Sequence, residues 1–238
     1  MLRLPGTYRA QGDTSLLAET LTRRGTVVGH RVLDVGTGGG ALALAAVRAG
    51  ARTVTAVDLS LRAVLSARLN GMLHRAPLQV LRGDLFAPVR GRTFDVVLAN
   101  PPYVPAETEV LPRHRPGRSW DGGRDGRAVI DRILEGVPAV LAPGGRLLMV
   151  HSALAGEEQT LDGLRRQGFE AEVVARADEP FGPVMRGRAE MLRSRGLLEP
   201  GQTHEELVVV EAVAPSRTID VRGSDLQDAR EGGFEDVA

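Results

Sequence analysis

The chain has 238 residues, 42% of them hydrophobic, so it is long enough for one large domain with a sizeable core. Its formal net charge is zero and 3% of its residues are aromatic, which argues against a general attraction to nucleic acid and against a base-stacking platform. It has no cysteine, which excludes disulfides, thiolate zinc sites and a cysteine nucleophile. It shows neither metal-ligand spacing nor an apolar run near the roughly 20 residues that span a bilayer, so we expect no bound metal, no membrane association and a cytoplasmic protein.

Strands and helices alternate through the first part of the chain. Residues 13–24 have leucines at helical spacing, with Asp13 as the expected N-cap. β-Branched runs then predict four strands, with helices at 41–49 and 59–73 between the first three of them. The predicted strands are residues 31–35, 53–58, 77–84 and 94–99.

The second part of the chain continues this alternation after a polar, arginine-rich loop expected from about 105 to 122. The patterns predict helices at 124–141, 156–167 and 184–198, a turn at 143–145, and strands at 146–152, 169–177 and 206–213. Residues 1–214 are therefore expected to form a single domain with an N-terminal helix. Residues 215–238 have few apolar side chains and several Gly, Asp and Glu, which predicts a disordered tail.

The alternation is typical of an α/β fold, in which helices cover both faces of a parallel sheet. Such sheets bind ligands at the carboxyl ends of their strands, where the strand order reverses. The loops after the first four predicted strands read DVGTGGG, DLS, GDLF and NPPY. We expect the functional site to be built from these four loops.

The first of these loops places Gly36, Gly38 and Gly40 between a strand and a helix. Glycines at such a turn permit positive φ and close approach to a ligand, and the helix that follows begins with unpaired N–H groups. The loop also satisfies the dinucleotide pattern G-x-G-x-x-G/A, so a nicotinamide cofactor stays open. Asp34, two residues before the first glycine, would repel a pyrophosphate but suits a cationic amine, such as the methionine part of S-adenosyl-L-methionine.

Two acidic residues follow the second and third predicted strands. Asp58, followed by Leu59, can accept hydrogen bonds from both ribose hydroxyls of an adenosine, and its alternative role is a helix N-cap. Asp84 can accept from an adenine amine while Leu85 and Phe86 flank the ring, and its alternative role is a turn residue. The three loops would then hold one adenosine-containing cofactor at one edge of the sheet.

The fourth loop, Asn100-Pro101-Pro102-Tyr103, ends a buried strand on an amide and two prolines. The prolines remove two backbone donors and fix two φ angles at about −65°, so the chain after Asn100 is rigid. The Asn100 side-chain oxygen and the Pro101 carbonyl can accept both N–H groups of a planar nitrogen, and Tyr103 can pack against its plane. The same device suits a glutamine amide or a nucleobase amine, and the alternative is a proline-stiffened strand end without a ligand.

Together, DVGTGGG, VDLS, GDLF and NPPY resemble the motifs of class I adenosyl-methionine-dependent methyltransferases. Over about residues 5–213 the chain is similar to the HemK-like protein glutamine-N5 methyltransferases that modify peptide-chain release factors, and segments 120–126 and 185–189 share this likeness. The resemblance implies a three-layer, doubly wound Rossmann-like fold with a mostly parallel seven-stranded sheet whose last strand is antiparallel. It also implies that the glycine loop and Asp58 hold the cofactor and that residues 100–103 hold the substrate amide.

The chain departs from the longer members of that family at its N-terminus. About 30 residues precede the first predicted strand, so it resembles the short form, without the N-terminal helical domain of the bacterial release-factor enzymes. The short form has a Glu-Asp-Ser/Thr element close to the cofactor, and this chain has Gly12-Asp13-Thr14 there. The resemblance therefore gives Thr14 a cofactor contact without the glutamate, and it implies that a small activator protein can be needed.

We expect an S-adenosyl-L-methionine-dependent N-methyltransferase that acts on a glutamine amide of a protein, most simply a release factor. The alternative acceptor is an adenine or guanine amine in RNA or DNA, against which the balanced charge argues. Beside the fourth loop, an arginine-rich cluster could bind phosphate or be a solvated loop; its residues are Arg113, His114, Arg115 and Arg118. A non-catalytic binding module and a dehydrogenase are further alternatives, and the four loops together argue against both.

Overall fold

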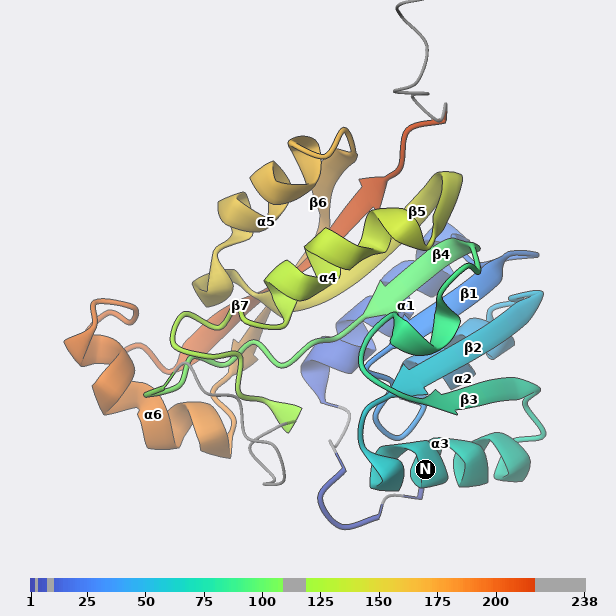
Figure 1. Ribbon diagram of the computed structural model, residues 1–238. Helices are drawn as coiled ribbons and strands as arrows, with labels where there is room; N and C mark the ends of the chain where they lie inside the picture. The colour runs from blue at the N-terminus through green and yellow to red at the C-terminus, as the bar shows by residue number, and fades with distance from the viewer. Residues whose placement is uncertain (3, 8–10, 109–118, 217–238) are drawn as a thin grey trace, which may run out of the picture.

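The computed structural model describes residues 1–2, 4–7, 11–108 and 119–216 (Figure 1). Its centre is a seven-stranded sheet with the order β3-β2-β1-β4-β5-β7-β6. The strands are β1 (Arg31–Val35), β2 (Thr53–Asp58), β3 (Leu78–Arg82), β4 (Phe94–Ala99), β5 (Leu141–Ser152), β6 (Glu170–Pro180) and β7 (His204–Val213). Strands β1 to β5 pair in parallel and β7 is antiparallel to both of its neighbours, which confirms the predicted mostly parallel sheet with an antiparallel last strand.

Helices cover both faces of this sheet, as Figure 1 shows for α1 and α2 behind it and α4 and α5 in front. The helices are α1 (Gly12–Arg24), α2 (Ala41–Arg48), α3 (Leu61–Leu73), α4 (Ile130–Gly136), α5 (Glu157–Arg165) and α6 (Pro183–Ser194), with short 3-10 turns η1 (Ala87–Val89), η3 (Val137–Ala139) and η4 (Ala153–Ala155). Leucines of α1 and α2 join one buried cluster, and those of α4, α5 and α6 join the other. The central parallel strands are buried on both faces, which explains their continuous apolar runs.

Three sequence predictions were wrong in detail. Helix α1 begins at Gly12 after Gln11, so Asp13 lies in its first turn and is not the N-cap. The helix predicted from 124 begins at Ile130, because Gly126 has a φ of +83°, which a right-handed helix excludes. The turn predicted at 143–145 lies inside β5, where the pairing with β4 shifts register.

Two predictions concern residues that the structure does not describe. The arginine-rich cluster at 113–118 lies outside the described residues, and so does the tail from 217 to 238. Pro215 and Ser216 are described, and the Pro215 carbonyl accepts a hydrogen bond from the Gly144 N–H at 3.2 Å. Among the described residues, no helix has the length and apolar character needed to cross a membrane.

Candidate functional site

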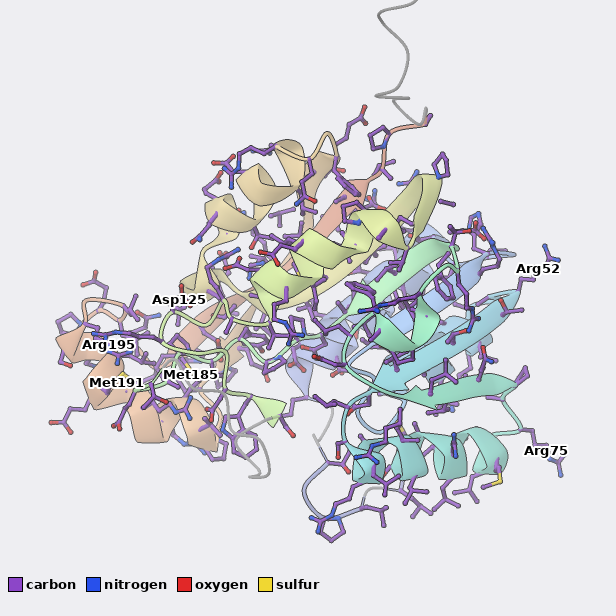
Figure 2. The ribbon with its side chains drawn as sticks, viewed as in Figure 1. Arg52, Arg75, Asp125, Met185, Met191 and Arg195 are labelled. Atoms are coloured by element: carbon purple, nitrogen blue, oxygen red, sulfur yellow. The ribbon has the colours of Figure 1, made fainter. Side chains whose placement is uncertain are left out.

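A cavity of about 570 Å³ lies at the carboxyl ends of β1 to β4, where the sequence predicted a site. Ten of the predicted residues line it: Gly36, Gly38, Asp58, Leu59, Asp84, Leu85, Asn100, Pro101, Pro102 and Tyr103. Thr14, Asp34 and Gly40 do not line it. Its wall also includes residues from the end of β6, the start of β7 and helix α6. One of them, Met185 of α6, is labelled in Figure 2, on the side of the molecule opposite Arg52 and Arg75.

The glycine loop presents its backbone to the cavity. Gly36 and Gly38 have φ angles of +73° and +55°, and the N–H groups of Gly36 and Thr37 donate to the Val57 carbonyl at 2.9 and 3.0 Å. A Cβ atom added at Gly36 would meet nothing within 4 Å, so the loop leaves open space there. Gly40 has a different role, because a Cβ there would lie 3.2 Å from the Ala67 Cβ of α3. It allows two helices to pack closely beside the loop.

Asp34 lies beneath the glycine loop and is fully buried. Its Oδ2 accepts hydrogen bonds from Thr37 Oγ1 at 2.6 Å and from the Ala43 N–H at 3.0 Å, which ties the loop to the first turn of α2. Its Oδ1 has no hydrogen-bond partner. Burial raises the pKa of Asp34 to about 7 against these two hydrogen bonds, so the carboxyl group is poised between its charged and neutral forms near neutral pH.

Asp58 connects β2 to the glycine loop. Its Oδ2 accepts from the Gly38 N–H at 2.9 Å, and its Oδ1 accepts from the Ser60 N–H at 2.8 Å. Ser60 is the N-cap of α3, so the alternative reading of Asp58 as a helix cap is wrong. The carboxylate and the neighbouring Leu59 both line the cavity.

The third loop lies at the far end of the cavity from α6. Asp84 accepts a hydrogen bond from Arg132 at 2.6 Å, a partner from α4 that the sequence did not reveal. Leu85 is held at a φ of +43°, a conformation that costs a non-glycine residue about 1–3 kcal/mol and is often found at binding sites. Phe86 does not line the cavity and packs beside Gly136 instead, so its expected place against an adenine ring is not confirmed.

The fourth loop is held at both ends by the first turn of α1. Asn100 Nδ2 donates to Thr14 Oγ1 at 3.1 Å, and the Tyr103 hydroxyl donates to Asp13 Oδ2 at 3.2 Å. Asp13 Oδ1 in turn accepts from the hydroxyl of Thr14 at 3.1 Å. Because the amide nitrogen of Asn100 is fixed in this way, its Oδ1 is left without a donor among the described residues. Thr14 therefore orients Asn100, and Asp13 is a site residue that local sequence reasoning took for a cap.

The segment from residue 119 to 126 forms backbone hydrogen bonds with the residues that follow Tyr103. The Val104 N–H donates to the Trp120 carbonyl at 2.8 Å, and the Gly122 N–H donates to the Val104 carbonyl at 3.0 Å. Gly126 has a φ of +83°, and a Cβ there would lie 2.3 Å from the Tyr103 carbonyl oxygen. These contacts give a physical reason for the glycine-rich segment that the sequence singled out only by resemblance.

Helix α6 closes the same region from the other side. Arg188 pairs with Asp121 and donates to the Pro105 carbonyl at 2.9 Å. Trp120, Asp121 and Met185 line the cavity, as do Glu179 and Glu205 at the facing ends of β6 and β7. Sequence periodicity gave no signal for these last two carboxylates, because a strand pattern does not say which strand ends face a ligand.

Comparison with known proteins gives consistent relatives. Residues 7–112 match the family model of the methyltransferase small domain. The chain is 34% identical over 181 residues to a putative protein N5-glutamine methyltransferase of Methanocaldococcus jannaschii, covering 76% of this chain and 90% of that protein. It is 33% identical to a release factor glutamine methyltransferase of Geobacter sulfurreducens, over 69% of this chain and 60% of the relative.

A ribosomal protein uL3 glutamine methyltransferase of Bradyrhizobium diazoefficiens is 43% identical over 52% of this chain and 43% of its own length. The chain thus spans most of the archaeal relative and about half of these bacterial relatives. Among solved structures, Mtq2 from the E. cuniculi Mtq2–Trm112 complex, titled as responsible for methylation of the eRF1 termination factor, superposes with a TM-score of 0.61 at 24% identity, over 88% of this chain and 99% of that one. The T. thermophilus 16S rRNA methyltransferase RsmC, solved with AdoMet and guanosine, gives 0.60 at 23% identity over 89% of this chain and 46% of that one, so these likenesses establish the fold.

Proposed function

Because the chain belongs to the protein N5-glutamine methyltransferase family, we propose that it transfers a methyl group from S-adenosyl-L-methionine to the side-chain amide nitrogen of a glutamine in a protein. The observation that carries the proposal is the state of Asn100. Its Nδ2 is fixed by Thr14 and its Oδ1 has no donor among the described residues, and Asn100 lines a cavity whose other loops suit an adenosine-containing cofactor. An oriented acceptor at this position is what a planar amide needs.

The residues around the cavity fit S-adenosyl-L-methionine. The open space at Gly36 leaves room for the ligand, and the buried Asp34 Oδ1 without a partner suits its ammonium group. Asp58 would accept from the ribose hydroxyls, and Asp84 with Leu85 would hold the adenine end. When bound, the cofactor supplies a methyl group on a positively charged sulfur. Thr14 does not line the cavity, so we give it the role of holding Asn100 in place of the cofactor contact implied by resemblance.

The chemistry requires orientation more than a strong base. An amide nitrogen is a poor nucleophile because its lone pair is delocalised into the carbonyl, and it reacts only when that lone pair is aimed at the methyl carbon at about 3 to 3.5 Å. Asn100 Oδ1 and the Pro101 carbonyl would accept the two N–H bonds, fix the amide and stabilise the positive charge that develops on nitrogen. Tyr103 would pack against the amide plane. The proton becomes acidic as the charge develops, so it can leave to solvent.

The identity of the protein acceptor is a separate proposal. The relatives include enzymes named for release factors and one named for ribosomal protein uL3. We propose a release factor, because further relatives bear the same name as the Geobacter sulfurreducens enzyme, including those of Gloeobacter violaceus and Deinococcus radiodurans, and the E. cuniculi structure concerns a termination factor. Such an acceptor would place the reaction in the cytoplasm. The E. cuniculi protein was solved as a complex with Trm112, so we further propose that a small partner protein raises the activity of this chain.

The test uses purified protein, tritiated S-adenosyl-L-methionine and a cell extract split into protein and nucleic-acid fractions, with purified release factor as a defined acceptor. We expect label in one protein of release-factor size and a methylated glutamine by mass spectrometry. Asn100→Ala should abolish the label while calorimetry shows unchanged cofactor affinity, and Gln167→Ala, an exposed site, should behave as wild type. Label in nucleic acid would overturn the proposal in favour of a base amine. If the protein binds the cofactor but labels neither fraction, the assay is repeated with extract proteins added back, and label that appears only then would support the proposed partner protein.

A further inference from the structure

Most carboxylates that face the cavity have donors within the protein. Asp58 accepts from two backbone N–H groups, and Asp84 pairs with Arg132. Asp13 accepts from Thr14 and Tyr103, as described above, and Asp121 pairs with Arg188. These four carboxylates therefore have partners within the protein. The loops after β1, β2 and β3, to which we assign the cofactor, are called the cofactor half of the site.

Glu179 and Glu205 are different. They lie directly opposite each other in the antiparallel pair of β6 and β7, and both line the cavity. Within the described part of the chain, Glu179 has no hydrogen bond or ion pair, and Glu205 has no ion pair and an Oε2 without a donor, although it is only 6% exposed. Burial raises the pKa of Glu205 and so do the nearby carboxylates of Asp13 and Glu179, while a hydrogen bond with the Ser152 side chain lowers it in part. Like charges in directly opposite positions destabilise a strand pair, and a buried carboxylate oxygen without a donor adds to that cost.

On the opposite face of the paired strands β6 and β7, an arginine neutralises a similar pair of acidic residues. The next cross-strand pair is Asp178 and Glu206, which is also acidic. There Arg176 bonds to Glu206 at 2.8 Å and to Glu157 at 2.6 Å. On the cavity face, no described arginine or histidine forms an ion pair with Glu179 or Glu205, so the described residues supply no counter-charge there.

Gly12 makes room for one of these carboxylates. A Cβ atom at Gly12 would lie 2.1 Å from Glu179 Oε2, so any side chain there would push the carboxylate away. Gly12 adjoins Asp13 and Thr14, the residues that hold Tyr103 and Asn100. The resemblance implies a glutamate close to the cofactor at this position, where this chain has Gly12. Glu179 instead places a carboxylate beside Gly12 from β6, and cofactor affinity in Glu179 variants separates a cofactor role from an acceptor role.

The place of β6 and β7 in the sheet indicates which ligand could supply a positive charge to Glu179 and Glu205. The glycine loop follows β1, and the Asp58 and Asp84 loops follow β2 and β3, on one side of β4. Strands β7 and β6 lie on the other side of β4, beyond β5, so the acceptor loop after β4 separates Glu179 and Glu205 from the cofactor half. The described residues contain no group of three or more His, Cys, Asp or Glu side chains that could hold a metal ion.

On these observations we infer that Glu179 and Glu205 form a subsite for a cationic side chain, arginine or lysine, that lies beside the acceptor glutamine in the protein substrate. The inference rests on the proposed function, which supplies the acceptor. A guanidinium or ammonium group there would receive charge-assisted hydrogen bonds from two carboxylates and relieve their repulsion. The same carboxylates would repel a phosphate backbone, so the subsite selects a basic peptide segment against nucleic acid.

The test measures methylation of glutamine peptides that carry one arginine at successive positions on either side of the glutamine, each matched by a peptide with neutral citrulline. In the wild-type protein, replacing the best-placed arginine by citrulline should raise KM about tenfold or more, the range of a charge-assisted hydrogen bond. Glu179→Gln and Glu205→Gln should each raise KM for the arginine peptide and reduce its advantage over citrulline. Asp178→Asn and Glu206→Gln, the neighbouring residues on the outer face, should leave the advantage intact. Cofactor affinity should be unchanged in all four variants.

A swap of the carboxylate between the two elements gives a second readout. Glu179→Gly should lose the arginine preference, and Glu179→Gly combined with Gly12→Glu should regain it, because the carboxylate then comes from α1. Equal methylation of arginine and citrulline peptides by the wild-type protein would overturn this inference and leave the proposed function standing. Weaker cofactor binding in Glu179→Gln or Glu205→Gln with an unchanged arginine preference would also overturn it, since the carboxylates would then serve the cofactor. If neither a glutamine peptide nor the release factor is methylated, the proposed function fails and this inference fails with it.

Discussion

Replacing Asp34 by asparagine should stabilise the cofactor-free protein at neutral pH and weaken cofactor binding. Asp34 is fully buried, and its Oδ2 already accepts from Thr37 and Ala43 while its Oδ1 has no partner. Asparagine can keep the two accepted hydrogen bonds through its own oxygen. It removes the negative charge that burial disfavours, and with it the acceptor that we assign to the cofactor ammonium.

The magnitude follows from the pKa of Asp34, which burial raises from 3.8 to about 7. An acid with a raised pKa keeps its proton in the folded state at pH values where the unfolded chain has lost it. The stability that it contributes is therefore complete below about pH 4 and is lost as the pH rises to about 7. A pKa rise of this size corresponds to about 4 kcal/mol in the fully deprotonated range.

His151 gives a pH dependence of the opposite sign. Burial lowers the pKa of His151 from 6.5 to about 4, so its contribution is lost as the pH falls from 6.5 to about 4. The two effects oppose each other in the wild-type protein over much of the same range. The difference between wild type and Asp34→Asn removes the His151 contribution and isolates that of Asp34.

The assay is urea unfolding of both proteins without cofactor at several pH values. The stability advantage of Asp34→Asn should grow by about 3 kcal/mol between pH 5 and pH 8. Calorimetry of the wild type at about pH 6, in buffers of different ionisation enthalpy, should show that cofactor binding releases a proton, and the variant should release less and bind more weakly. An advantage that does not change with pH would refute the assigned pKa, and cofactor affinity equal to that of wild type would refute the role of Oδ1.

Three further predictions concern the residues around the acceptor loop and the core. Thr14→Val should lower kcat about tenfold, because it removes the hydroxyl that holds Asn100 Nδ2, and Thr14→Ser should restore it in a single-turnover assay. Gly126→Ala should cost about 2–4 kcal/mol in urea unfolding, since its Cβ meets a carbonyl at a positive φ, whereas Gly187→Ala, where a Cβ meets nothing, should cost none. His151→Gln should be more resistant than wild type to unfolding at about pH 5, and equal sensitivity to acid would show that His151 titrates normally.

The sequence predicted that the loops after β1, β2 and β3 line the cavity, because each loop has a recognisable local pattern. Each of these loops follows a β-branched strand, and a parallel sheet brings the carboxyl ends of β1 to β4 to one edge. The positive φ angles of Gly36, Gly38 and Gly40 follow from glycine at a strand-to-helix turn. What the pattern could not show was which of these residues line the cavity and which lie beneath it: Asp34 and Gly40 do not line it, and Gly40 packs against Ala67 of α3.

The acceptor half was less predictable because its contacts are long-range. Asp13 and Tyr103 are ninety positions apart, and the hydroxyl contact between them leaves no periodic signal. An aspartate before a leucine run has the local features of an N-cap, so that role was predicted instead. Likewise α4 begins later than its apolar spacing indicates, because the segment before it packs against the residues at the end of the fourth loop. Gly122 donates to the Val104 carbonyl, and Gly126 lies against the Tyr103 carbonyl.

The position of the acceptor loop explains why one fold can serve relatives named for different protein acceptors. Asn100 lies at the end of β4, with the cofactor loops on one side and the ends of β5, β7 and β6 on the other. Changes at the cavity ends of β6 and β7 or in α6 would alter the acceptor surface without moving the glycine loop or Asp58. Acceptor selectivity should therefore be set by residues such as Glu179 and Glu205, and a substitution there should change which glutamine is methylated before it changes cofactor affinity.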